Sequence, residues 1–153
     1  MDEIDLKILN ILQAKARVPN VEVARQVGMA PSAVLERIRK LEKQGYIDGY
    51  EVRLSPQRFN RNLVAFVTVQ IAPAESEAET ARTLAAITEV QEIHFVSGND
   101  AFLLKLRVAD TQHLGRIIRE RIGSHPFVRS THTAIVLSTY KETAQFPINQ
   151  KGP

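Results

Sequence analysis

The chain has 153 residues, of which 44% are hydrophobic and 24% charged, and a net charge of +3. This composition is that of a globular protein with one ordinary domain or two small ones. Cysteine is absent, which excludes disulfide frameworks and thiolate metal sites. No secretory signal is recognisable, and no apolar run reaches the roughly 18 residues of a membrane helix, so we expect a cytoplasmic protein.

Three helices are predicted in the first part of the chain. Apolar residues at helical spacing predict the first over residues 2–16, with acidic side chains in its first turn. Asn20 is expected to cap a short second helix that ends at Gly28, because glycine adopts left-handed backbone conformations freely. A third helix, with Pro31 in its first turn, is expected to close at Gly45. This order is typical of a helix-turn-helix.

The segment after the third helix reads YIDGYEVRLSP. A turn at Asp48-Gly49 between two short β-prone pieces is what a wing or a connecting strand would have. A short polar stretch follows near residues 52–62, and there we place the boundary between two domains.

From Leu63 the period of the apolar residues changes from helical to alternating. Ser76 and Glu79 form a capping-box pattern ahead of one helix, and Asp110 or Thr111 is expected to cap another. The inner face of the second of these helices is predicted to consist of Leu114, Ile117, Ile118 and Ile122. The expected strands are LVAFVTVQI, VQEIHFVSG, AFLLKLRVA and FVRSTHTAIVLSTY. The order β-α-β-β-α-β is that of a ferredoxin-like αβ-sandwich, so the fold class is α+β.

The third helix has two unlike faces. At 100° per residue, Val34, Ile38 and Leu41 form a stripe that is expected to pack on the first two helices. The opposite face carries small, basic and amide or acidic groups, which we take as the candidate DNA-binding residues: Ser32, Ala33, Leu35, Glu36, Arg39, Lys40 and Lys43.

Each of these residue types suits part of a DNA duplex. Ser32 near the helix N-terminus suits a phosphate, while Arg39 reaches a guanine edge or a phosphate. Lys40 and Lys43 suit the sugar-phosphate backbone. Glu36 suits a cytosine amino group and Leu35 a thymine methyl group.

The alternative is a solvated face with ion pairs inside the helix, such as Glu36 with Lys40. Arg37 lies at the edge of the apolar stripe. We therefore interpret Arg37 as structural and expect it to pair with an acidic group of the first helix.

Several segments resemble the Lrp/AsnC family of transcription regulators, also called feast/famine regulators. They are DEIDLKILNILQ, VARQVGMAPSAVLERIRKLEKQGYI, DGYEVRLSP, FVTVQI, VQEIHFVSGNDAFLLKLRV, RIIRERIGSHPFVRSTHTAIVL and Lys141. The resemblance implies a (winged) helix-turn-helix and a C-terminal αβ-sandwich that dimerises through its sheets. It also implies further assembly of dimers, commonly to octamers, and an amino acid or related effector bound between C-terminal domains.

The sequence departs from the family pattern in three places. Ala30 stands where members usually carry a capping Ser or Thr, and Glu36 replaces a basic residue. In the effector loop the run is GNDAFLL, so Ala101 occupies the usual position of an aspartate and Asp100 that of an aromatic residue. On a strand, a shift by one residue reverses the face on which a side chain lies.

The candidate effector site is built around this loop. Gly98 allows backbone N–H groups to approach a carboxylate, and Asn99 or Asp100 suits an ammonium group. The resemblance adds Ala101 at the family's aspartate position, with Thr131 and Thr133 lining the same cleft. The alternative is an ordinary hairpin turn with ordinary strand threonines.

Neither a metal site nor a catalytic centre is predicted. His94, His113, His125 and His132 form no helical i, i+4 pair, although His94 and His132 could be neighbours across a sheet. The sequence contains no phosphate-binding glycine loop and no nucleophile elbow. We therefore expect no enzyme activity and no cofactor.

The expected domains are a helix-turn-helix over residues 1–52, a linker over 53–62, an effector-binding and oligomerisation domain over 63–141, and a flexible tail over 142–153. The expected function is that of an effector-responsive, homo-oligomeric regulator that binds double-stranded DNA in the nucleoid. Two rival functions remain open. One is an architectural, nucleoid-type protein without an effector, and the other is a metabolite-binding regulatory subunit or small enzyme.

Overall fold

The computed structural model describes residues 1–72, 77–98 and 101–148. Within these residues, no helix is long and apolar enough to cross a membrane.

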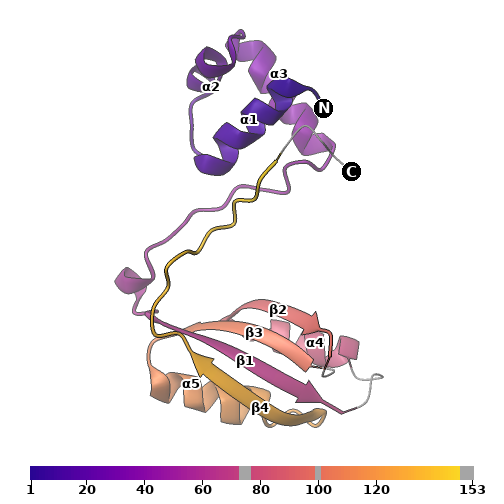
Figure 1. Cartoon of the computed structure of the whole chain (residues 1–153), viewed down its shortest axis with the longest axis vertical. Coiled ribbons are helices and arrows are strands. Elements are labelled where there is room, and N and C mark those ends of the chain that lie inside the picture. Colours follow the sequence, from indigo (N-terminus) through magenta and orange to yellow (C-terminus); the bar gives the residue numbers. More distant parts are fainter. Residues whose placement is uncertain (73–76, 99–100, 149–153) are drawn as a thin grey trace. The chain divides into compact units, whose positions relative to one another are not determined.

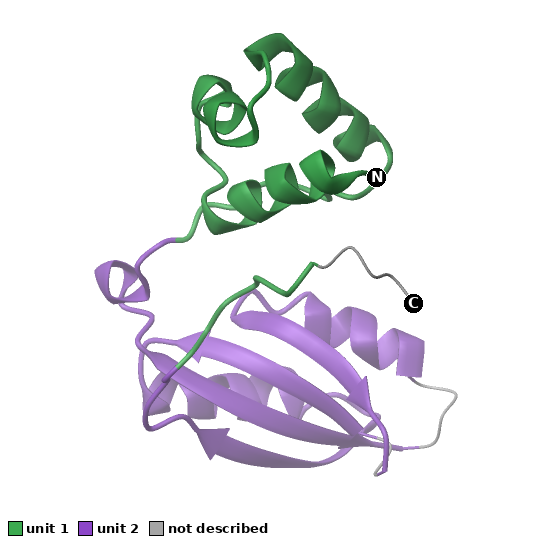
Figure 2. Ribbon diagram, turned by 45° about the horizontal axis from the view of Figure 1, so that its top comes forward, with its two compact units in different colours: residues 1–53, 141–153 green, residues 54–140 purple. Residues whose placement is uncertain are grey.

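The chain forms two compact units (Figure 2). Residues 1–53 and 141–153 make up the first, which we call the helical unit, and residues 54–140 make up the second, the sheet unit. The expected domain order is thus recognisable, but the last part of the chain belongs to the helical unit rather than standing alone.

The helical unit contains α1 (Glu3–Ala14), α2 (Asn20–Val27) and α3 (Pro31–Lys43), labelled in Figure 1. One cluster of buried apolar side chains holds the three helices together, because each helix is apolar on one side only. The members of this cluster are Ile8, Leu12, Val23, Ala24, Val34, Ile38 and Leu41.

Local signals set the helix ends. Asp2 caps α1, accepting from the N–H groups of Ile4 and Asp5 at 2.9 Å each. Gly28 ends α2 and Gly45 follows α3, both with positive φ, at 70° and 73°, as predicted. Asn20 is the first residue of α2 and does not cap it. Pro19 holds the cap position instead, without a side-chain hydrogen bond, so the prediction for Asn20 was wrong.

No strand forms in residues 47–55, all of which the structure describes. The β-prone side chains there lack a partner to pack against: Val52 is 83% exposed and Leu54 61%. A strand is stabilised by pairing and by burial of one face, and neither is present within this segment. The expected wing is therefore an irregular chain, attached to α3 by a 2.8 Å hydrogen bond from the Tyr50 hydroxyl to Glu42.

The last described residues contact the end of α1. The Gln13 side chain donates to the carbonyl of Phe146 at 3.0 Å and accepts from its N–H at 3.4 Å. Gln145 donates to the Gln13 carbonyl at 3.0 Å. The flexible tail expected over residues 142–153 thus has specific partners up to Phe146, and residues 149–153 lie outside the described part.

The sheet unit is an antiparallel sheet in the order β2-β3-β1-β4. The strands are β1 (Leu63–Ile71), β2 (Val90–Val96), β3 (Ala101–Val108) and β4 (Val128–Ile135). Both α4 (Glu77–Ala85) and α5 (Thr111–Ile117) cover the same face of the sheet (Figure 1). This is the predicted βαββαβ arrangement. The predicted cap at Ser76 lies outside the described residues, whereas Asp110 caps α5 through the N–H of His113 at 2.7 Å.

A π-helical turn, η3 (Ile118–Ile122), continues α5. In an α-helix, position 121 would lie about 40° from Ile117, and Arg121 would point into the core. The wider turn, closed by the Gly123 N–H on the Ile118 carbonyl at 2.7 Å, buries Ile122 completely instead and leaves Arg121 exposed.

Candidate nucleic-acid interface and ligand site

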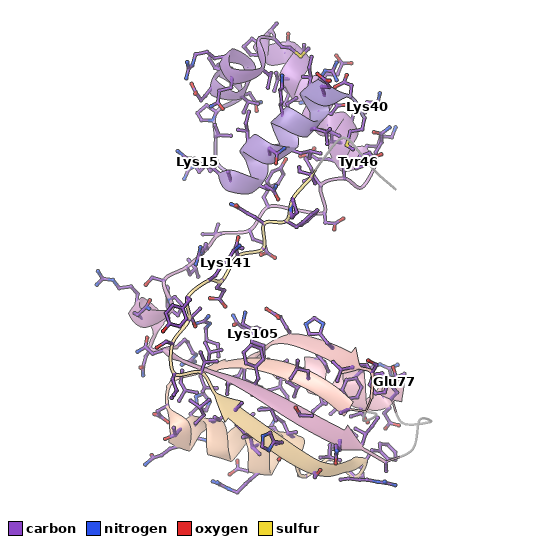
Figure 3. All side chains as sticks on the ribbon, viewed as in Figure 1. Lys15, Lys40, Tyr46, Glu77, Lys105 and Lys141 are labelled. Carbon is purple, nitrogen blue, oxygen red and sulfur yellow. The ribbon has the colours of Figure 1, made fainter. Side chains whose placement is uncertain are left out.

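The two faces of α3 differ as predicted. Val34, Ile38 and Leu41 are at most 6% exposed. On the other side, the hydroxyl, acidic and basic side chains are exposed, while Ala33 and Leu35 are half-buried. The exposed members of this group are Ser32, Glu36, Arg39, Lys40 and Lys43, with Lys40 labelled in Figure 3.

The charges on this outer face have no internal partners. Among the described residues, Glu36 forms no ion pair with Lys40, and neither Arg39 nor Lys43 pairs with an acidic group. The alternative in which ion pairs within α3 satisfy the face lacks its expected contact. The cations of the outer face are therefore available to an anionic partner.

The N-terminus of α3 is also uncapped. Ala30 occupies the cap position and offers no side-chain hydrogen bond. The N–H groups of Ser32 and Ala33 lie in the first turn, where a helix has no internal acceptor and carries partial positive charge. This end of α3 can accept an anion such as a phosphate oxygen.

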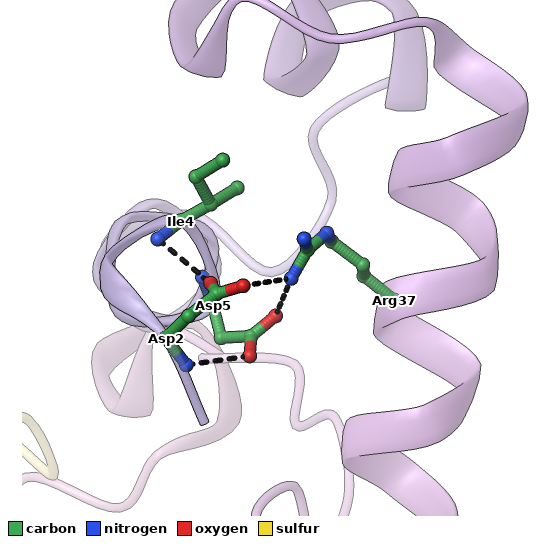
Figure 4. A network of polar contacts seen from close by, with 4 residues as sticks. All are labelled: Asp2, Ile4, Asp5 and Arg37. Carbon is green, nitrogen blue, oxygen red and sulfur yellow. Dashed lines mark hydrogen bonds and ion pairs between the residues drawn. The ribbon is translucent and has the colours of Figure 1, made fainter.

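Arg37 fixes α3 against the start of α1 (Figure 4). Its Nη1 lies 2.7 Å from a carboxylate oxygen of Asp2 and 2.7 Å from one of Asp5. The backbone N–H of Asp5, and then Arg37, lower the pKa of Asp2, and the two carboxylates raise the pKa of Arg37. The prediction that Arg37 is structural and pairs with the first helix is confirmed.

The candidate effector residues do not form one site within a single chain. Gly98 has a φ of 105°, Asn99 and Asp100 lie outside the described residues, and Ala101 is fully buried. Ala101 pairs with Gln70, and Gln70 pairs with Ser130 on β4. Thr131 and Thr133 neighbour that level of β4, two strands and about 10 Å away from β3.

The threonines also belong to the other face of the sheet. Thr131 pairs with Val69 and Thr133 with Val67, and these two valines are fully buried in the core. Side chains of paired residues share a face, and successive residues alternate. Thr131 and Thr133 therefore lie on the helix side, opposite to the side that Ala101 shares with Gln70.

The face of the sheet that carries no helix is partly apolar. Phe66 on β1 is 38% exposed and pairs with Lys105 on β3, which is labelled in Figure 3. Lys105 donates to Glu92 on β2 at 2.8 Å. The register places Val64, Leu103 and Ala134 on this same face.

The histidines are dispersed. His94 lies on β2 and His132 on β4, which are the two opposite edges of the sheet, so the suggestion that they are neighbours was wrong. His113 Nε2 lies 3.3 Å from Glu89. Among the residues that the structure describes, no group of three or more His, Asp or Glu side chains is arranged to hold a metal ion.

Sequence reasoning missed one polar pocket in the sheet unit. Its lining comes from the segment before β1, the loop before β2, the start of β2 and the end of β3. No local motif could have revealed it, because the contributing segments are far apart in the chain. The residues are Arg61, Thr88, Glu89, Gln91 and Arg107.

Comparisons with known proteins agree on one family. A model of the Lrp/AsnC ligand binding domain matches residues 64–146, and a model of a winged helix-turn-helix DNA-binding domain matches residues 1–48. The leucine-responsive regulatory protein of Escherichia coli K12 is 36% identical, with 99% of this chain and 93% of that protein covered. The leucine-responsive regulatory protein of Haemophilus influenzae is 35% identical, with 94% and 87% covered.

Solved structures give the same result. A transcriptional regulator from Neisseria meningitidis, in complex with L-methionine, has a TM-score of 0.93 and 31% identity, with 97% of both chains covered. A feast or famine regulatory protein of M. tuberculosis, also complexed with L-methionine, has a TM-score of 0.86 and 31% identity. It covers 95% of this chain, which covers 97% of it.

Proposed function

The chain belongs to the Lrp/AsnC family of transcription regulators, and from that membership we propose which residues bind DNA and where an effector binds. It is a DNA-binding transcription regulator with an amino-acid ligand-binding domain, and not an enzyme. The observation that carries the proposal is the outer face of α3, whose exposed cations have no ion-pair partner among the described residues. We propose that this regulator acts in the cytoplasm, on the nucleoid.

In this proposal α3 lies in the major groove. The N–H groups of Ser32 and Ala33 bind a phosphate, and Lys40 and Lys43 bind the backbone on either side. Arg39 reads a guanine edge. The remaining contacts are those of Glu36 with a cytosine amino group and Leu35 with a thymine methyl group.

The structure offers a surface for the dimer that such binding needs. Two recognition helices read successive major grooves when they are about 34–36 Å apart, which requires two copies of the chain. We propose that the helix-free face of the sheet, with Phe66 and Leu103, is covered by the same face of a second copy. We further propose that dimers assemble to an octamer, which analytical ultracentrifugation tests directly.

The effector site requires more than one chain in this proposal. Because the hairpin at Gly98–Asp100 and the threonines Thr131 and Thr133 are separated within one protomer, we propose that they meet between copies. An amino acid bound there shifts the assembly only if it binds one packing of dimers better than another. Isothermal titration against the twenty proteinogenic amino acids, repeated with Asp100→Ala, tests this site.

The burial of Ala101 favours one rival function. At the family's aspartate position this chain offers a methyl group with no exposed surface, which cannot hold an ammonium group. An architectural protein that binds DNA without an effector is consistent with that observation. In that case no amino acid would raise the melting temperature or produce heat on titration.

DNA selection tests the interface. Bound fragments are selected from random duplex DNA, and the Kd of the selected site is measured for wild type, Arg39→Ala and Lys43→Ala. Arg39→Ala should weaken specific binding by about 1–3 kcal/mol and relax one base position. Lys43→Ala should weaken all sequences alike and reduce the salt dependence of log Kd by about one phosphate contact. Unchanged affinity and preference in Arg39→Ala would refute this placement of α3.

A further inference from the structure

The polar pocket that the sequence did not reveal lies at one end of the sheet, where β2 begins and β3 ends. Its volume is about 230 Å³. The hairpin at Gly98 joins the other ends of these two strands. Because β3 spans Ala101–Val108 at about 3.3 Å per residue, the two places are roughly 20 Å apart. The pocket is therefore separate from the effector site proposed above.

Hydrogen bonds hold the walls of this pocket in place. The Arg107 N–H donates to the Glu89 carbonyl at 2.9 Å, and its Nε donates to Gln91 at 3.1 Å. The Glu89 carboxylate accepts from the Thr88 hydroxyl at 3.0 Å and lies 3.3 Å from His113. Side chains tethered in this way lose little conformational entropy when a ligand binds.

One wall is an anion and another is a cation with unused donors. Burial raises the pKa of Glu89, but the hydrogen bond from Thr88 and the nearby His113 and Arg121 outweigh it and lower that pKa, so Glu89 is a carboxylate at neutral pH. Among the described residues, Arg61 forms a single hydrogen bond, from Nη1 to the Asn60 carbonyl at 3.2 Å. A guanidinium has five N–H donors, arranged to match a carboxylate.

We propose that this pocket binds a free α-amino acid, with its carboxylate on Arg61 and its ammonium group on Glu89. The proposal rests on the function proposed above, in which the sheet unit is a ligand-binding domain, and adds a second location for the ligand. The pocket is smaller than the roughly 300–1,000 Å³ of drug-sized sites, as a single amino acid requires. Two guanidinium groups and one carboxylate complement a zwitterion better than a phosphate, which Glu89 repels.

Titration calorimetry on the full-length protein tests the site. Each of the twenty proteinogenic L-amino acids is titrated, with sodium acetate and inorganic phosphate as anions that lack an ammonium group. Arg61→Gln should weaken the Kd of the amino acid that binds by about tenfold or more, the loss expected for one charge-assisted contact. Arg58→Gln is the matched control, because Arg58 is exposed in the neighbouring 3-10 turn (Pro56–Phe59) and does not line the pocket.

Two further variants separate this proposal from the hairpin site. Asp100→Ala should leave binding at the pocket unchanged, whereas Glu89→Gln should weaken binding of the amino acid without improving that of acetate. Equal affinities of Arg61→Gln and Arg58→Gln would overturn the proposal, as would loss of all binding in Asp100→Ala. Binding of phosphate without any amino acid would also overturn it. Each of these results leaves DNA binding through Arg39 untouched, so the proposed regulator function is tested separately.

Discussion

Replacement of Leu41 by alanine should unfold the helical unit while the sheet unit stays folded. Leu41 is 2% exposed and belongs to the core of α1, α2 and α3. The core of the sheet unit is a separate cluster that shares no residue with it. A cavity in one core therefore removes packing energy from that core alone.

The expected loss is large compared with the stability of the helical unit. A buried Leu→Ala change costs about 2–5 kcal/mol, through lost transfer energy and the cavity left behind. A single core in a unit of this size supplies no more than about 3–5 kcal/mol. Each kcal/mol lowers the melting temperature of a small domain by about 4–8 °C, so a shift of at least about 8 °C is expected.

Differential scanning calorimetry and far-UV circular dichroism on the full-length protein measure this shift. In Leu41→Ala the transition that loses helical signal should move down, while the other transition stays in place. Leu104→Ala, in the fully buried part of the sheet core, is the matched control and should have the reverse effect. If both variants instead lowered one common transition equally, the two cores would be energetically coupled and the reasoning would be refuted.

Three further changes probe single contacts. Arg25, and then Gln26, lower the pKa of Glu22 to about 2, so its contribution to stability is present above pH 4.5 and is lost as the pH falls toward 2; melting curves of Glu22→Gln should depend less on pH in this window. Gln13→Ala should speed hydrogen exchange of the Phe146 amide, and equal exchange rates would mean that the contact is absent in solution. Gly98→Ala places a β-carbon at a φ of 105° and should cost about 1–3 kcal/mol in urea unfolding; an unchanged midpoint would contradict this.

Short-range chemistry explains why most of the fold could be predicted. The ends of α2 and α3 follow from Gly28 and Gly45, because a positive φ selects glycine independently of the rest of the chain. The buried stripe of α3 and the exposed face opposite to it follow from helical periodicity alone. Even Arg37 could be assigned, since it lies beside an apolar stripe that must face the acidic start of α1.

Features that depend on distant partners could not be predicted. The expected wing failed because strand propensity produces a strand only where another strand or a core accepts it, and Val52 has neither. His94 and His132 seemed close only while the strand order was unknown. The contacts of Gln13 with Phe146 join residues that are 133 positions apart, a separation that no periodicity reveals.

The candidate ligand sites divide in the same way. The hairpin at Gly98 could be located, because glycine and a charge between two strands form a local signal. Arg61 and Glu89 could not be assigned to a pocket, since each is an ordinary polar residue until the sheet brings β2 and β3 beside the start of β1.

The attachment of the chain's final described residues to α1 has a practical consequence for labelling. A fluorophore or spin label at Phe146, which is 65% exposed, would report on the helices that we propose bind DNA, although its sequence position follows the whole sheet unit. In chain order, the sheet unit is an insertion between two pieces of the helical unit. A truncation designed to isolate the N-terminal domain at Arg53 would therefore leave the Gln13 side chain without the Phe146 hydrogen bonds, and a faithful isolated domain needs the C-terminal segment joined back to it.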